Sequence, residues 1–107
     1  MADPVTLINV FEVPADQVDA IVADWRRRAE LMSTMPGFRD YQLHRAISAD
    51  ARFQLINVAH WDSAEAWQAA TSNPEFQAQI SVVANNPNVT ATPALYQVAE
   101  VASAANA

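Results

Sequence analysis

The spacing of the apolar residues changes several times along this chain, and the order of the changes restricts the folds open to it. Residues 5–13 read VTLINVFEV, a β-branched and aromatic run that stops at Pro14, as a strand does. Beyond Pro14 the apolar residues recur every three or four positions, which predicts one face of a helix: Val18, Ile21, Val22, Trp25, Ala29, Met32 and Met35. Pro36 and Gly37 end this pattern, and Gly37, the only glycine of the chain, suits a turn with positive φ.

A period of two returns at Phe38, where apolar and polar residues begin to alternate again. The residues SADA at 48–51 have the composition of a turn. The sequence therefore predicts a hairpin of two strands, at 38–47 and 52–61.

A second helical region follows the hairpin. Asp62 is expected to cap it, with Glu65 at the reciprocal position of a capping box. Asn73 and Pro74 form a second start signal, because Pro favours the first position of a helix. The helical region is therefore expected to break into two pieces near Ser72.

The remaining segments complete a β-α-β-β-α-β order. A polar loop is expected at 84–93, a last strand at 94–101 and a disordered tail at 103–107. This order predicts an α+β, ferredoxin-like fold with one antiparallel sheet and both helices on one face. We expect one domain over residues 1–107, with its core at 5–101.

The strands are apolar on both faces, although the helices of such a fold cover only one. Alternation places one apolar set on each face. One set is Ile8, Val10, Ile56 and Val58, and the other is Leu7, Phe11, Phe53 and Leu55. A bare apolar sheet face usually marks an interface. The sequence therefore predicts a homodimer with two sheets packed face to face.

Composition disfavours several classes of partner. The net charge is −6 and the chain has no lysine, so nucleic acid and anionic membrane surfaces would be repelled. It has no cysteine for disulfides or thiolate ligands. The MADPV start has no basic region, and no apolar run approaches the roughly 18 residues of a membrane span, so a cytoplasmic location is expected.

Two groups of polar residues, the histidines and a run of arginines, are not expected to form a functional site. His44 and His60 show no HxH or HExxH spacing, so no metal site is expected, and His60 should point away from Asn57. The run of three arginines at 26–28 is interpreted as a solvated helix face.

The most informative motif is the tetrapeptide LINV, which occurs at 7–10 and again at 55–58. Each copy carries an asparagine inside a strand, Asn9 and Asn57, and an unpaired buried amide costs about 1–3 kcal/mol. Each amide is therefore satisfied locally, exposed, or kept for a ligand. A local hydrogen bond in a packed core is the plainer alternative.

Strand alternation places Asn57 and Trp61 on one side, and the helix that carries Trp67 begins just after them. With Asn9 on the same face, two amides and two indoles would surround one small-molecule pocket. Its expected walls are aromatic: Phe11, Trp25, Phe38 and Phe76.

Four stretches resemble the antibiotic biosynthesis monooxygenase family: LINVFEVP, MPGF, LHRA and ARFQLINVAHWDSAEAW. The resemblance covers roughly residues 5–101. It implies a dimeric α+β barrel that oxidises a polyphenol with O₂, without metal, flavin or heme. Asn57, Trp61 and Trp67 are similar to the Asn, Trp and Tyr of anthrone oxygenases of aromatic polyketide pathways. Because an indole N–H can only donate, Trp67 cannot shuttle a proton as tyrosine can.

The same broad family includes heme-degrading monooxygenases, which use a strand-one Asn together with a Trp and a heme-ligating His. Asn9 matches the first of these, but Ala70 and Ile80 stand where the Trp and the His are expected, so the axial ligand is missing.

The sequence thus predicts a monooxygenase that needs no cofactor and forms a quinone from a polycyclic phenol, hydroquinone or anthrone. Trp61 and Trp67 would stack on the small aromatic substrate, while Asn57 and Asn9 would bind the developing oxyanion. A ligand-binding or structural dimer without chemistry remains an alternative, and heme degradation is a further one.

Overall fold

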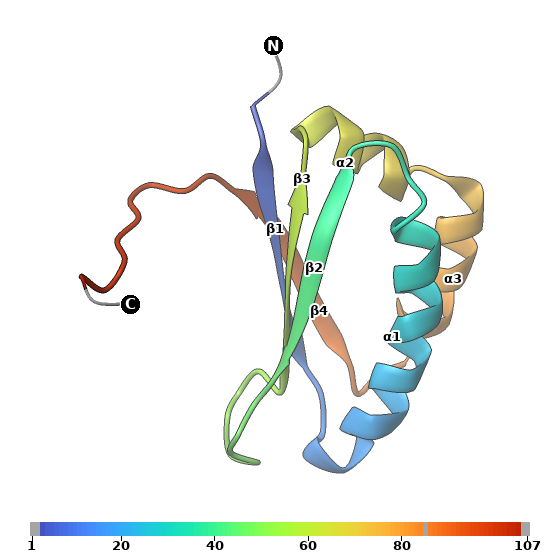
Figure 1. Ribbon diagram of the computed structural model, residues 1–107. Helices are drawn as coiled ribbons and strands as arrows, with labels where there is room; N and C mark the ends of the chain where they lie inside the picture. The colour runs from blue at the N-terminus through green and yellow to red at the C-terminus, as the bar shows by residue number, and fades with distance from the viewer. Residues whose placement is uncertain (1–2, 85, 106–107) are drawn as a thin grey trace.

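The computed structural model describes residues 3–84 and 86–105 and contains the expected order of strands and helices (Figure 1). The elements are β1 (Val5–Glu12), a short 3₁₀ turn η1 (Ala15–Gln17), α1 (Val18–Met32), β2 (Phe38–Arg45), β3 (Leu55–Trp61), α2 (Ala64–Thr71), α3 (Pro74–Ala84) and β4 (Thr90–Tyr96). The predicted ferredoxin-like α+β fold is confirmed.

The four strands form one antiparallel sheet in the order β2-β3-β1-β4. Helices α1, α2 and α3 lie on one face of it, and no described helix lies on the other (Figure 1). The bare face carries Ile8, Val10, Ile56 and Val58, which are only half-buried in the single chain. The homodimer that would cover them stays a prediction.

The core under the helices is divided into two clusters of buried residues. One contains Leu7, Ala59, Trp61 and Ala70, and the other contains Phe11, Val13, Val18 and Leu55. Along β1 and β3, Asn9 and Asn57 lie between the two clusters, and they face each other in the register of the strands. The sheet therefore has a pair of amides where the apolar core is interrupted.

The turn before β2 depends on Gly37, as expected. Its φ is +87°, and a Cβ built on it would lie 2.5 Å from the Cβ of Ala66. Any side chain here would be strained by the backbone and would collide with α2.

The start of α2 differs from the prediction. Ser63, not Asp62, is the N-cap, and its side chain accepts a hydrogen bond from the Ala66 amide at 3.0 Å. Asp62 instead accepts one from Arg39 Nε at 2.5 Å. With the cap moved by one residue, Glu65 no longer occupies the reciprocal position, so the predicted capping box is wrong.

The predicted break in the helical region is confirmed. α2 ends at Thr71 and α3 begins at Pro74. The Asn73 side chain caps α3 by accepting from the Glu75 amide at 2.9 Å, as its sequence signal indicated.

The last strand was placed wrongly. It spans Thr90–Tyr96 instead of 94–101, so it begins inside the predicted loop at 84–93. The segment was predicted as a loop because it is polar. It also contains Pro93, but β4 is an edge strand, where a missing N–H is tolerated. Val98 and Val101, which suggested a strand, are exposed. Residues 97–105 have no regular structure, and 106–107 of the predicted tail lie outside the described residues.

Candidate functional site

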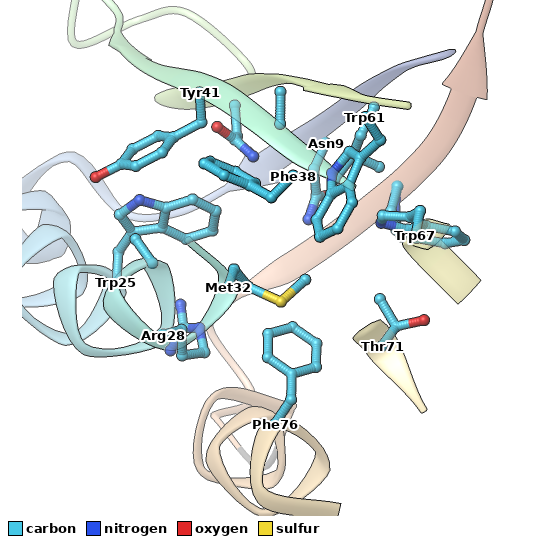
Figure 2. A pocket seen from close by; sticks show the side chains of 15 residues that line it. Asn9, Trp25, Arg28, Met32, Phe38, Tyr41, Trp61, Trp67, Thr71 and Phe76 are labelled. Atoms are coloured by element: carbon cyan, nitrogen blue, oxygen red, sulfur yellow. The ribbon is translucent and has the colours of Figure 1, made fainter. Parts of the chain in front are cut away.

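A cavity lies between the sheet and the three helices (Figure 2). The empty space in it and in front of it, open solvent included, is about 640 Å³. Its lining is Leu7, Asn9, Trp25, Arg28, Ala29, Met32, Phe38, Tyr41, Asn57, Ala59, Trp61, Trp67, Thr71, Phe76 and Pro93. Aromatic and apolar walls with a few polar groups are typical of a small-molecule site.

The sheet contributes a pair of amides to this cavity. Because Asn9 and Asn57 are partners in the antiparallel register, their side chains leave the same face at neighbouring positions. Asn57 is only 2% exposed. Neither Oδ1 has a hydrogen-bond partner among the described residues, and the two amides do not bond each other.

Three indoles surround the amides from different elements. Trp61 comes from β3, Trp25 from α1 and Trp67 from α2. Trp61 is 1% exposed and packs edge to face with Phe38, the ring centroids being 5.3 Å apart. The Nε1 atoms of all three tryptophans are buried without an acceptor among the described residues.

Unpaired polar atoms are therefore concentrated at this one place. Within the described residues, five of the buried side-chain atoms without partners belong to the cavity lining, and another, Gln79 Oε1, belongs to α3 outside it. Buried polar groups in folded proteins are normally paired, and an unpaired one costs about 1–3 kcal/mol. A ligand with its own donors and acceptors would satisfy these groups.

Of the predicted site residues, seven line the cavity and one does not. Asn9, Asn57, Trp61, Trp67, Trp25, Phe38 and Phe76 are brought together as expected. Phe11 is absent from the lining. It belongs to the second core cluster and packs edge to face against Trp25, with centroids 5.8 Å apart, so it supports the wall from behind.

Arg28 is the main residue that sequence reasoning misread. Arg26 and Arg27 are exposed, as a solvated face requires, but Arg28 is only 6% exposed and lines the cavity. Its Nη1 donates to Asp24 Oδ2 at 2.5 Å, and its guanidinium lies 5.5 Å from the centre of the Trp25 ring. The helical period contained the signal, since Arg28 follows Trp25 by three positions and precedes Met32 by four.

Tyr41 was missed as a site residue for a different reason. An irregularity in the pairing of β2 with β3 lies between Phe38 and Asp40. It places both Phe38 and Tyr41 over the cavity, opposite Trp61 and Ala59. Strict alternation from Phe38 would have turned Tyr41 away.

The two histidines lie outside the cavity. His44 and His60 are exposed, and His60 Nδ1 lies 2.5 Å from Asp40 Oδ1. His60 is the register partner of Thr6, in phase with Ile8 and Val58, so it points away from Asn57 as predicted. Within residues 3–84 and 86–105, no three metal-ligating side chains gather into a possible site. None of the described helices is long and apolar enough to cross a membrane.

The model of the antibiotic biosynthesis monooxygenase family matches residues 4–81. The chain belongs to this family. Among the lining residues that the structure describes, Pro93 alone lies beyond the matched segment, so the cavity is built almost wholly from the monooxygenase domain.

Proteins similar to this chain have different described activities. A mycobilin-producing heme oxygenase of Mycobacterium tuberculosis is 35% identical over 82 residues, which is 77% of this chain and 76% of the relative. A presumed monooxygenase from Shewanella loihica PV-4 is 37% identical with a TM-score of 0.78, covering 94% of this chain and 99% of the other.

The cofactor-independent oxygenase SnoaB from Streptomyces nogalater has the same fold, with a TM-score of 0.75 at 24% identity, over 94% of this chain and 97% of SnoaB.

Proposed function

We propose that this protein is a cofactor-independent monooxygenase that converts a polycyclic phenol, hydroquinone or anthrone into a quinone with O₂. One observation carries the proposal: five buried polar atoms that have no partner within the described part of the chain surround a cavity whose walls are otherwise aromatic and apolar. Membership of a monooxygenase family supports it. The fold is compatible with this chemistry, since SnoaB has it as well.

Substrate binding follows from the shape and chemistry of the walls. The rings of Trp25, Trp61 and Phe38 offer faces and edges for a flat polycyclic molecule. The amides of Asn9 and Asn57 offer both N–H donors and carbonyl acceptors, and each indole offers one donor. A phenol with neighbouring oxygen atoms would pair with these groups.

For an anthrone the reaction is balanced without an added electron donor. Loss of a proton from the reacting carbon gives an electron-rich anion, which passes one electron to O₂. The two radicals combine to form a C–O bond, and uptake of a proton gives a hydroperoxide. Loss of water then leaves the quinone carbonyl, so one oxygen atom enters the product and the other leaves as water.

The protein accelerates these steps by stabilising negative charge. In this proposal the side-chain N–H groups of Asn9 and Asn57 donate to the substrate oxygen on which the anion is delocalised, and then to the peroxide oxygen. Donors fixed in advance in a dry site act strongly, and removing one typically costs about 10²–10³ in rate. Trp61 and Trp67 add N–H donors that need no reorganisation.

The described lining offers no clear general base. Asp, Glu and His, the side chains that most often act as general bases, are absent from that lining. We therefore assign the first deprotonation to solvent, helped by the acidity of the substrate and by the donors that stabilise its anion.

Heme as the substrate is the second candidate, favoured by the 35% identity to the mycobacterial heme oxygenase. Asn9 fits this alternative, but His44 and His60, the two histidines of the chain, lie outside the cavity and position 80 is isoleucine. Hemin titration tests it, because a stoichiometric complex that degrades with a reductant would replace the quinone-forming reaction as our conclusion.

The direct test is to incubate the purified protein with an anthrone in air and follow quinone absorbance against a protein-free control. A chelator should leave the rate unchanged, and ¹⁸O₂ should place one labelled atom in the quinone. A rate no faster than that of the control would leave only a ligand-binding or structural role for this fold.

A further inference from the structure

Arg28 brings a positive charge into a cavity that is otherwise neutral. Among the lining residues that the structure describes it is the only charged one, and neither Asp nor Glu accompanies it. The protein as a whole carries a charge of −6, which repels anions. A buried cation in an acidic protein is costly to keep unless it has anionic partners.

Asp24 is one such partner but does not use the whole guanidinium. A guanidinium has five N–H donors arranged in a planar fork. The structure shows one of them, on Nη1, bonded to Asp24 Oδ2, and places the group beside the Trp25 ring. No other partner of Arg28 occurs among the described residues, although its side chain is only 7% exposed. The contact with Asp24 thus fixes the orientation of the Arg28 guanidinium and leaves the other N–H donors of that group for the cavity.

The cavity has two distinct polar regions. Asn9 and Asn57 belong to the sheet, whereas Arg28 belongs to α1 on the helical side, as Figure 2 shows for Asn9 and Arg28. Apolar side chains such as Met32 and Phe38 line the space as well. A ligand that satisfies both regions needs one oxygen group at the reacting ring and an anionic group elsewhere on the molecule.

We propose that Arg28 selects substrates that carry a carboxylate away from the reacting ring, so that the substrate class is polycyclic aromatic acids. This inference rests on the proposed function for the identity of the ring system. A carboxylate fits because two parallel N–H···O bonds match the arginine fork, a geometry that lysine cannot provide. The Asn9–Asn57 pair remains available for the reacting oxygen.

The test uses binding of a product-like quinone, so it does not depend on turnover. Anthraquinone-2-carboxylate and its neutral carboxamide have nearly the same shape, and their binding would quench the fluorescence of the cavity tryptophans. Wild type should bind the carboxylate about 10- to 100-fold more tightly, the value of a charge-assisted hydrogen bond. A ratio near one in wild type would overturn the proposal, whatever the variants do.

Variants then assign the preference to Arg28. Arg28→Gln should remove the preference by weakening carboxylate binding far more than carboxamide binding, while Arg28→Lys should keep part of it. Arg27→Gln is the matched control, because it makes the same charge change on the exposed neighbour and should keep the preference. Asp24→Asn should keep or increase it, since the fork loses a competing anion. A preference that survives Arg28→Gln would refute the assignment.

A second comparison, with porphyrins, distinguishes the two possible sources of the carboxylate, a polycyclic aromatic acid and a porphyrin. Metal-free protoporphyrin IX and its dimethyl ester are compared in the same variants. A dependence on Arg28 seen with the porphyrin and not with the anthraquinone would overturn the proposed substrate class and support the heme alternative. If the anthrone assay fails but wild type still prefers anthraquinone-2-carboxylate to its carboxamide, the proposed chemistry is wrong and the anion-binding role of Arg28 stands.

Discussion

Replacing Asn57 by alanine tests whether its buried amide serves the fold or a ligand. Asn57 is 2% exposed, and its Oδ1 has no partner among the described residues. The free protein already bears the cost of that unpaired group, about 1–3 kcal/mol, and the substitution relieves it. The atoms removed also border an existing cavity, so little new empty space is created within the packed core.

The two effects on stability oppose each other, and the net change should stay within about 1 kcal/mol. For a domain of this size that corresponds to a shift of the thermal midpoint of at most about 4–8 °C, in either direction. Quinone formation should fall much further, by about 10²–10³, because one donor to the developing anion is lost.

Gln54 offers a matched comparison, because it is a buried amide that the fold does satisfy. It is 5% exposed, and its Nε2 donates to the carbonyl oxygens of Ser48, Ala49 and Ala51 at 3.1, 3.2 and 2.7 Å. Gln54→Ala should therefore destabilise the protein by about 2 kcal/mol, since the two N–H groups of Nε2, which these three carbonyl oxygens share, are lost. Activity per folded molecule should remain close to that of the wild type, because Gln54 does not line the cavity.

The assay measures thermal unfolding and initial quinone formation on the same preparations of wild type and both variants. The two variants should show opposite patterns. Asn57→Ala should keep its stability and lose turnover, while Gln54→Ala should lose stability and keep its turnover. If Asn57→Ala melted many degrees lower and kept its turnover, the amide would be a structural group and our reasoning about the site would fail.

Four further outcomes are expected. Trp61→Phe keeps most of the ring and deletes the N–H, so turnover should fall with little loss of stability, and unchanged turnover would remove Trp61 from the site. Gly37→Ala should lower the thermal midpoint by several degrees, because its φ is +87° and its new Cβ would lie 2.5 Å from the Cβ of Ala66; a midpoint equal to that of the wild type would contradict this. Sedimentation should give the mass of a dimer and Val58→Asp should give monomers, whereas a wild-type mass near one chain at micromolar concentration would refute the sheet-face argument. Added hemin should give no sharp Soret band, and a stoichiometric complex would support the heme alternative.

Local patterns in the sequence predicted the order of elements and much of the site. A period of two or of 3.6 depends on neighbouring residues alone, so the hairpin, α1 and the shared face of Asn57 and Trp61 could be read directly. Gly37 and Asn73 were also predictable, because positive φ and helix capping are properties of short segments.

The features that sequence reasoning missed depend on contacts between distant segments. Whether Arg28 is buried depends on what packs over α1, and the helical period places it on a boundary of the apolar face. The position of β4 was fixed by its pairing with β1, where an edge strand accepts Pro93, and not by the apolar content of residues 97–101.

The sequence alone thus determined which residues within a regular strand or helix share a face, because alternation and helical spacing are set within each element. Tertiary structure decided how those faces meet. It paired Asn9 with Asn57, shifted the register between Phe38 and Asp40 so that Tyr41 reached the cavity, and buried Arg28 beside it. The physical reason is that register and burial are fixed by the packing of the whole chain, which no single segment specifies.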